Sequence, residues 1–115
     1  MKNYKWSDWK IAQWHKKTFD CDYNSQLLKL CEEVRESYVE KGKNKQRWIE
    51  ELADVSIAAA ALDLRFKRHL GALVNDYIRF LPEADEIMTA RDAKMEINKN
   101  RSWEFWDGVY RHTEA

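Results

Sequence analysis

The chain has 115 residues, of which 20 are Lys or Arg and 20 are Asp or Glu, so its formal charge at neutral pH is zero. This length predicts a single domain with one core, covering residues 1–115. An even charge balance argues against a general polyanion binder, which would be strongly basic, so we do not expect nucleic acid as a partner. Only three Gly and one Pro are present, which favours long helices over turn-rich β architecture.

No segment has the features of a membrane anchor or a targeting signal. Residues 1–6 are not followed by the apolar stretch of a signal peptide. The longest apolar run without charge, residues 55–62, is far too short to cross a bilayer. Cys21 and Cys31 have no metal-binding spacing and are expected to be reduced thiols. We therefore expect a cytoplasmic protein without a membrane partner.

Hydrophobic periodicity predicts about five helices, of which the first begins after Ser7 as N-cap. Trp6 and Ile11 have the spacing of a hydrophobic staple around this cap. Residues 19–24 form a turn, and a second helix then covers about residues 25–41 before Gly42. Its apolar stripe is predicted to consist of Leu27, Leu30, Cys31, Val34 and Tyr38.

The third predicted helix is the most apolar one. It follows a basic, flexible connection at residues 41–47 and covers about residues 48–67. Between residues 52 and 64 it is apolar on nearly every side, which predicts the central helix of the domain. A fourth helix carries apolar residues between 70 and 81, and Pro82 stands where a fifth helix can begin.

The fifth helix is predicted to run to about Trp103, with its basic residues on its apolar side. At about 100° per residue, this side carries Ala84, Ile87, Met88, Arg91, Lys94, Met95, Asn98 and Arg101. A solvated helix would place its charges opposite the apolar face. Lys94, Asn98 and Arg101 are therefore expected to point inward, where cations need anions from the protein or from a ligand.

Carboxylates gather in two short clusters, at residues 32–36 and 51–54. A three-residue step places Glu33 beside Glu36, and Glu51 beside Asp54, on one helix face with Cβ atoms about 5–6 Å apart. A charged surface helix would explain the first cluster alone, including Glu32. Asp54 opens the most apolar helix, however, where an unpaired carboxylate is costly. The two pairs together predict a metal site made of oxygen ligands.

The ligand types favour Mg²⁺, with Mn²⁺ as a substitute. None of the three His residues follows an acidic residue by three positions, as in di-iron bundles, and zinc prefers His or Cys. Mg²⁺ commonly completes its shell with substrate phosphates, which Lys94 and Arg101 are suited to bind. Internal salt bridges between these cations and the carboxylates are the alternative. A planar base could stack on any of the aromatic residues near these motifs, Trp14, Phe19, Trp48 and Trp103.

Residues 30–36 (LCEEVRE) and 50–55 (EELADV) resemble the EExxE and ExxD motifs of MazG-like nucleoside triphosphate pyrophosphohydrolases. Residues 14–19, 26–30, 94–103 and 107–110 also resemble this family, whereas residues 63–91 carry no pattern of it. The family belongs to the all-α NTP pyrophosphatase superfamily. The resemblance implies an all-α, four-helix-type bundle of about five helices, which we expect to assemble as a homodimer or a dimer of dimers.

The resemblance also implies an activity and the residues for it. A (d)NTP would be hydrolysed to the (d)NMP and pyrophosphate, for nucleotide-pool control or housecleaning. Glu33, Glu36, Glu51 and Asp54 would hold Mg²⁺, and Glu32, Glu33 and Glu36 would form the catalytic cluster. The substrate would contact Lys94, Asn98, Arg101, Lys29, Trp48 and Trp14. The alternative is a non-catalytic helical module that binds metal or nucleotide, or joins an assembly.

Overall fold

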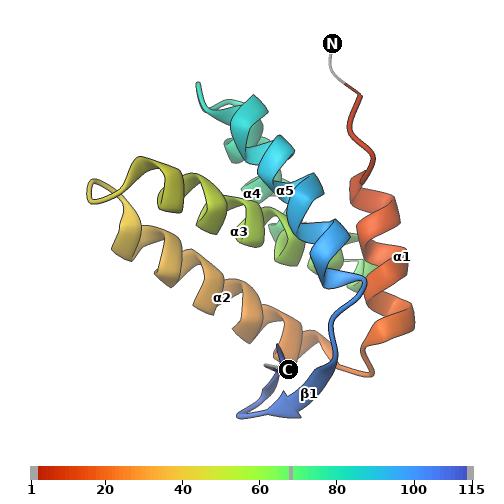
Figure 1. Cartoon of the computed structure of the whole chain (residues 1–115). Helices are drawn as coiled ribbons and strands as arrows, with labels where there is room; N and C mark the ends of the chain where they lie inside the picture. Colours follow the sequence, from red (N-terminus) through yellow and green to blue (C-terminus); the bar gives the residue numbers. More distant parts are fainter. Residues whose placement is uncertain (1–2, 68, 114–115) are drawn as a thin grey trace.

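The computed structural model describes residues 3–67 and 69–113, which form five helices followed by a small hairpin (Figure 1). The elements are α1 (Asp8–Thr18), α2 (Tyr23–Glu40), α3 (Lys45–Phe66), α4 (Leu70–Arg79), α5 (Ala84–Asn98), β1 (Trp103–Trp106) and β2 (Val109–His112). The prediction of five helices is confirmed, whereas the all-α class is corrected by the two strands. No helix among the described residues is long and apolar enough to cross a membrane.

Helix α3 is the centre of the domain, as its apolar sequence predicts. It packs against α1, α2, α4 and α5, and residues 55–62 are buried on every side. Helix α4 crosses it closely at Gly71, where an added Cβ would lie 2.0 Å from the carbonyl oxygen of Ala59. Gly71 therefore sets the distance between these two helices, because no larger side chain fits there.

The beginning of α1 confirms both predicted capping features. The Ser7 hydroxyl accepts a hydrogen bond from the backbone N–H of Lys10. Trp6 and Ile11 are buried together in one apolar cluster with Met95 of α5. This staple fixes the direction in which the N-terminal segment enters α1.

The predicted apolar stripe of α2 is wrong beyond Leu30. Val34 and Tyr38 are 44% and 77% exposed. The buried face of α2 consists instead of Gln26, Leu30, Glu33 and Ser37. The polar members of this face can be buried because they make internal hydrogen bonds: the Gln26 amide donates to the Ala58 carbonyl at 3.0 Å, and the Ser37 hydroxyl donates to the Val34 carbonyl at 2.7 Å.

Several helix ends differ from the predicted ones. The Asn44 side chain caps α3, so the helix begins at Lys45 and the preceding connection is shorter than predicted. Pro82 lies in the turn before α5 and not at its first position, because the helix begins only at Ala84. Helix α5 ends at Asn98, five residues before the predicted end at Trp103.

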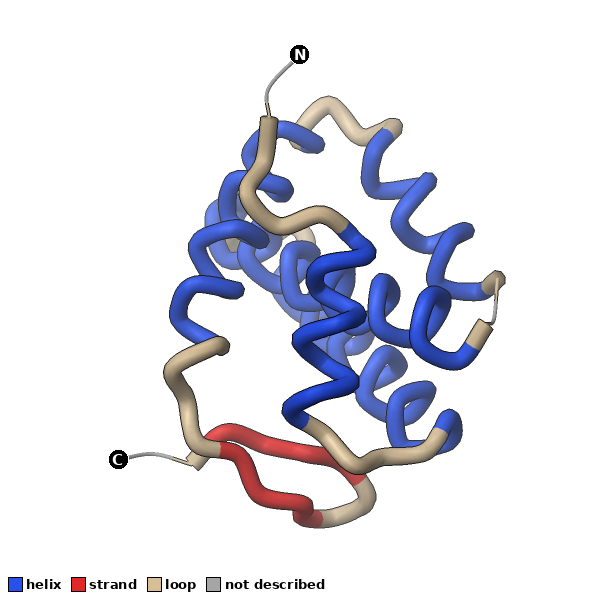
Figure 2. The backbone as a smooth tube through the Cα atoms, turned by 90° about the vertical axis from the view of Figure 1, so that its right-hand side faces the viewer, coloured by secondary structure: helices blue, strands red, loops and turns tan. Residues whose placement is uncertain are grey.

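The hairpin after α5 was not predicted. Its strands are antiparallel, with Trp103 opposite His112 and Phe105 opposite Tyr110. The turn residues Asp107 and Gly108 have φ values of 55° and 84°, the left-handed region that an Asp-Gly hairpin turn requires. In both views the hairpin lies at one end of the helical body (Figures 1 and 2).

Candidate functional site

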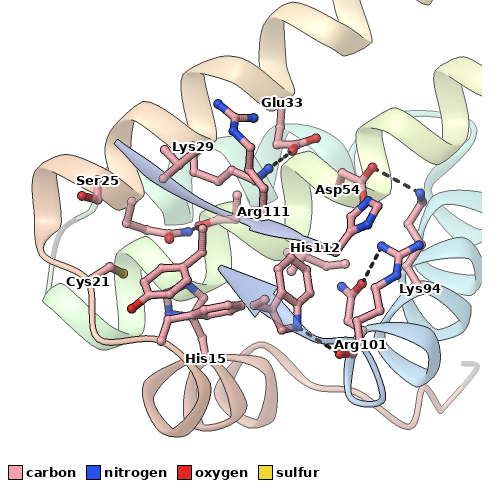
Figure 3. A pocket seen from close by; sticks show the side chains of 18 of the residues that line it. His15, Cys21, Ser25, Lys29, Glu33, Asp54, Lys94, Arg101, Arg111 and His112 are labelled. Carbon is pink, nitrogen blue, oxygen red and sulfur yellow. Dashed lines mark hydrogen bonds and ion pairs between the residues drawn. The ribbon is translucent and has the colours of Figure 1, made fainter. Parts of the chain in front are cut away.

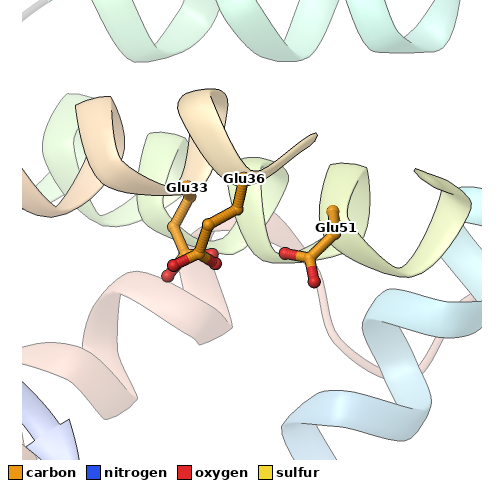
Figure 4. A group of neighbouring side chains, drawn as sticks. All are labelled: Glu33, Glu36 and Glu51. Carbon is orange, nitrogen blue, oxygen red and sulfur yellow. The ribbon is translucent and has the colours of Figure 1, made fainter. Parts of the chain in front are cut away.

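Three glutamates from two helices converge at one point. Glu33 and Glu36 come from α2 and Glu51 from α3, and one carboxylate oxygen of each lies within 4.8 Å of the other two (Figure 4). The spacing of Glu33 and Glu36 places both on the side of α2 that faces α3. The predicted meeting of the two acidic clusters is confirmed for these three residues, a set that could hold a divalent cation.

Two oxygens of this group are buried without a hydrogen-bond partner among the described residues. They are Oε2 of Glu33 and Oε2 of Glu51, and the Glu33 side chain is only 8% exposed. The other oxygen of Glu33 forms an ion pair with Lys29 at 2.9 Å. A buried carboxylate oxygen without a donor is costly, and a bound cation would remove this cost.

The crowding of negative charge makes the carboxyl groups harder to ionise. Burial, together with the charges of Glu33 and Glu51, raises the pKa of Glu36 to about 7. Burial and the charge of Asp54 also raise the pKa of Glu51. Burial raises the pKa of Asp54 to about 6, although Lys94 counteracts part of this effect. At neutral pH the site therefore favours any added positive charge.

This crowding predicts a pH-dependent effect of Glu36→Gln on stability. The pKa of Glu36 rises from 4.5 to about 7 on folding, so the stability it contributes is complete below the lower value and is lost as pH rises through the higher one. The variant lacks this titration. We expect its melting temperature, relative to the unaltered protein, to increase from pH 5 to pH 8.

The measurement is thermal unfolding followed by circular dichroism in buffers with a chelator. Titrating groups away from the cluster are present in both proteins and cancel in the difference. One of them is His15, whose pKa is lowered to about 3 by burial and by the charge of Arg65. Glu51 contacts Glu36, so its own titration contributes to the difference. A melting-temperature difference that does not change with pH would contradict the prediction.

Asp54 lies beside this group but is engaged with a cation. Its Oδ2 lies 3.2 Å from Nζ of Lys94, and both side chains are 29% exposed. Asp54 is not among the three carboxylates that lie within 4.8 Å of one another. Its role as a metal ligand stays a prediction, and its ion pair with Lys94 is one of the internal salt bridges that the alternative interpretation of these residues predicts.

A cleft of about 500 Å³ runs between α2, α3, α5, the end of α1 and the hairpin (Figure 3). It joins parts of the chain that are distant in sequence. Among its lining residues are eight of the predicted site residues: Trp14, Lys29, Glu33, Glu36, Asp54, Lys94, Asn98 and Arg101. Arg101 lies beyond the end of α5, exposed, and donates a hydrogen bond to the Asn98 side-chain oxygen at 3.4 Å.

Three predicted site residues lie outside the lining of this cleft. Trp48 packs against the main core, which removes it as a candidate for stacking in the cleft. Glu32 accepts a hydrogen bond from Arg111 of the hairpin at 2.9 Å. Glu32 and Glu51 line a neighbouring groove on the α2 surface, which Glu36 and Arg111 also line. Glu36 and Arg111 therefore line both the cleft and this groove.

The hairpin supplies cleft residues that sequence reasoning did not assign to the site. These are Val109, Tyr110, Arg111 and His112, while Trp103 was only one of several aromatic candidates. The signal that could have found them is Asp107-Gly108, a typical two-residue hairpin turn. The helical pattern of α5 continues in the sequence as far as Arg101, beyond the end of the helix at Asn98, and this conceals the strand that begins at Trp103.

One end of the cleft is rich in rings. The ring centroid of Phe19 lies 5.3 Å from that of Trp14, 5.0 Å from that of Trp103 and 4.9 Å from that of Tyr110. Comparison of the chain with models of protein families, with curated proteins and with solved structures found no match. The chemistry of the site is therefore interpreted from its own geometry, which combines carboxylates, cations and aromatic rings in one cleft.

Proposed function

We propose that this protein is a Mg²⁺-dependent, MazG-like nucleoside triphosphate pyrophosphohydrolase that converts a (d)NTP into the (d)NMP and pyrophosphate. One observation carries the proposal: the cleft has two carboxylates of α2, the buried Glu33 and the exposed Glu36, on one side and Lys94 and Arg101, from α5 and the segment after it, on another. A polyphosphate with bound metal needs both kinds of group. The resemblance of residues 30–36 and 50–55 to the family motifs supports the same activity.

The residues present fit a hard divalent cation. Glu33, Glu36 and Glu51 would hold it, since all three offer carboxylate oxygens and two of these oxygens are buried without a donor among the described residues. Asp54 is a further candidate, through exchange of its ion pair with Lys94. Bound Mg²⁺, or Mn²⁺ in its place, would neutralise charge on the phosphate oxygens.

The other polar residues of the cleft would act directly on the substrate. Lys94 and Arg101 would bind phosphate oxygens, Lys as a point charge and Arg through its planar fork. Lys29 would strengthen the positive field, and the Asn98 amide would contact the sugar or the base. A water that attacks the α-phosphorus must lose a proton, and a carboxylate of the cluster that lines the cleft, Glu33 or Glu36, would accept it.

Glu32 lies in a different position from the one expected of a catalytic base. Its carboxylate pairs with Arg111 and does not line the cleft. We therefore assign to Glu32 the attachment of the hairpin to α2. The proposal retains Glu33 and Glu36 as the catalytic carboxylates of the cluster.

A pyrophosphate-release assay over all canonical ribo- and deoxynucleoside triphosphates, with dUTP and dITP included, tests this function. We expect turnover of at least one nucleotide with Mg²⁺ or Mn²⁺ and none with a chelator. The products should be the nucleoside monophosphate and pyrophosphate, separated by ion-exchange chromatography. If none of the nucleotides is turned over with either metal, the proposal is wrong.

A non-catalytic binding module is the second candidate, and two contacts favour it. Lys94 already pairs with Asp54, and Lys29 with Glu33, so the cations are neutralised within the protein. Self-association fits either candidate, because α4 exposes Leu73, Tyr77 and Phe80 at 67%, 62% and 89%. We propose a homo-oligomer on this basis.

A further inference from the structure

The hairpin carries four ring side chains on one face. In a strand, residues two apart share a face, and so do directly paired residues of neighbouring strands. Trp103 pairs with His112, and Phe105 pairs with Tyr110. Their ring centroids are 5.9 Å and 5.2 Å apart, respectively. We call this surface, made of Trp103, Phe105, Tyr110 and His112, the ring face.

Residues between those of the ring face attach the hairpin to α2. Val109 is 1% exposed, and Arg111 forms an ion pair with Glu32 at 2.9 Å. At Gly108, an added Cβ would lie 3.2 Å from the Leu28 side chain, so the turn also lies close to α2. A two-stranded hairpin with four-residue strands is not stable alone, so these contacts hold it in place.

The ring face is divided between the cleft and the outer surface. Trp103, Tyr110 and His112 line the cleft, whereas Phe105 does not line it and is 54% exposed. Trp103 and Tyr110 are both half-buried and are fixed by polar contacts. The Trp103 indole N–H donates to the Asn98 carbonyl at 3.4 Å, and the Tyr110 hydroxyl donates to the Asp20 carbonyl at 3.3 Å.

The rings of the cleft gather around Phe19, apart from the ion pair of Lys94 and Asp54, whereas Arg101 lies near Trp103 because both contact Asn98. Trp103 and Tyr110 both contact Phe19, at the end of α1, and Trp14 lies 6.1 Å from Trp103 between ring centroids. Figure 3 shows Cys21 and Ser25 at the end of the cleft away from Asp54 and Lys94. A ligand that fills the cleft therefore needs an anionic part and a planar, uncharged part.

We propose that Trp103 and Tyr110, together with Trp14, bind the planar ring of the ligand, and that the hairpin is the element that distinguishes a nucleotide from a bare polyphosphate. The inference rests on the proposed function, since it places the phosphates of the same ligand beside Lys94 and the acidic cluster. Base stacking on aromatic rings tolerates different bases, so the subsite adds affinity for a nucleoside without choosing one base.

The test compares two ligands and two variants with a matched control. The ligands are the α,β-imido analogues of the four dNTPs and inorganic tripolyphosphate, both with Mg²⁺, measured by isothermal titration calorimetry. Tyr110→Leu and Trp103→Leu should weaken binding of the nucleotide analogues about tenfold and leave tripolyphosphate binding unchanged. Phe105→Leu, on the ring face but outside the cleft, is the matched control and should bind both ligands as the unaltered protein does.

The other outcomes contradict the proposal, and each shows which of the two proposals is wrong. If both ligands lose affinity equally, or neither does, the ring subsite is wrong while the proposed hydrolysis stands on its own assay. If the unaltered protein binds neither ligand, both proposals fail.

A second measurement needs no variant and covers the case in which a Leu variant does not fold by circular dichroism. Nucleotide analogues should quench the intrinsic tryptophan fluorescence of the unaltered protein, and tripolyphosphate should not. Equal quenching by the two ligands would overturn the subsite.

Discussion

Replacement of Glu33 by Gln is expected to lower the rate of pyrophosphate release by about 100-fold or more while the fold persists. Catalysis of phosphoryl transfer depends on positioned charge, and the loss of one such group commonly costs two to three orders of magnitude. Glu33 is the most enclosed member of the acidic cluster and has one oxygen free of hydrogen bonds among the described residues. A neutral amide of the same shape removes a metal ligand without opening a cavity.

The stability of the metal-free protein should not fall together with its activity. Glu33 adds to the charge repulsion that raises the pKa of Glu36, so its neutralisation relieves this repulsion. We expect the melting temperature of the variant without metal to be unchanged or higher, and its increase on addition of Mg²⁺ to be smaller than that of the unaltered protein. Steady-state kinetics and thermal unfolding with and without Mg²⁺ measure both effects.

Glu50→Gln is the matched control, because Glu50 is an exposed carboxylate on α3 beside Glu51 and does not line the cleft. It should leave turnover unchanged. A structural salt-bridge network, as in the non-catalytic alternative, would instead make the Glu33 variant lose stability in proportion to any lost function. That result would argue against a catalytic role for the acidic cluster.

The convergence of Glu33, Glu36 and Glu51 could be predicted because it depends on local geometry. A three-residue step in a helix fixes the shared face of Glu33 and Glu36, and the apolar sequence of α3 makes it the neighbour of that face. The contact of Asp54 could not be predicted in this way. Its partner Lys94 comes from α5, and the spacing within α3 carries no information on how α5 packs against it.

The errors on α2 have a different physical origin. Val34 and Tyr38 were assigned to the core because they are apolar, yet Gln26 and Ser37 occupy it because their hydrogen bonds are satisfied internally. Hydrophobic periodicity cannot predict the burial of a polar side chain that forms a hydrogen bond with another helix or with its own helical turn. The hairpin was missed because the helical pattern up to Arg101 was extended too far.

Arg91 of α5 is an inward-facing cation whose two terminal nitrogens are paired within the protein, while its Nε is buried without a hydrogen-bond partner among the described residues. Its side chain is 4% exposed, and its NH1 lies 2.5 Å from Oδ1 of Asp8 and 3.1 Å from the Ser56 hydroxyl. Its NH2 donates to the Trp6 carbonyl at 2.8 Å. The prediction that basic residues of this face need anions is therefore confirmed at Arg91, and the anion belongs to the protein.

We expect Arg91→Met to lower the free energy of unfolding by about 3–5 kcal/mol, because it leaves the Trp6 carbonyl and one oxygen of Asp8 without their charged donor. Arg79 provides the matched control, because it pairs with the other oxygen of Asp8 at 2.5 Å but is 44% exposed. Arg79→Met should cost about 1 kcal/mol or less, as exposed ion pairs usually do. Urea denaturation of both variants measures the two values.

Measurement of Arg91→Met both alone and together with Asp8→Asn separates the contribution of the ion pair to stability from the contribution of side-chain packing. Hydrogen bonds from Arg79 and Arg91 outweigh burial and hold the pKa of Asp8 below its usual value, so both arginines stabilise its charged form. When the charge of Asp8 is removed first, Arg91→Met should cost clearly less than in the unaltered protein, because no buried anion is left unpaired. Equal costs in the two backgrounds, or equal costs for Arg79 and Arg91, would mean that Arg91 contributes through its packing rather than its charge.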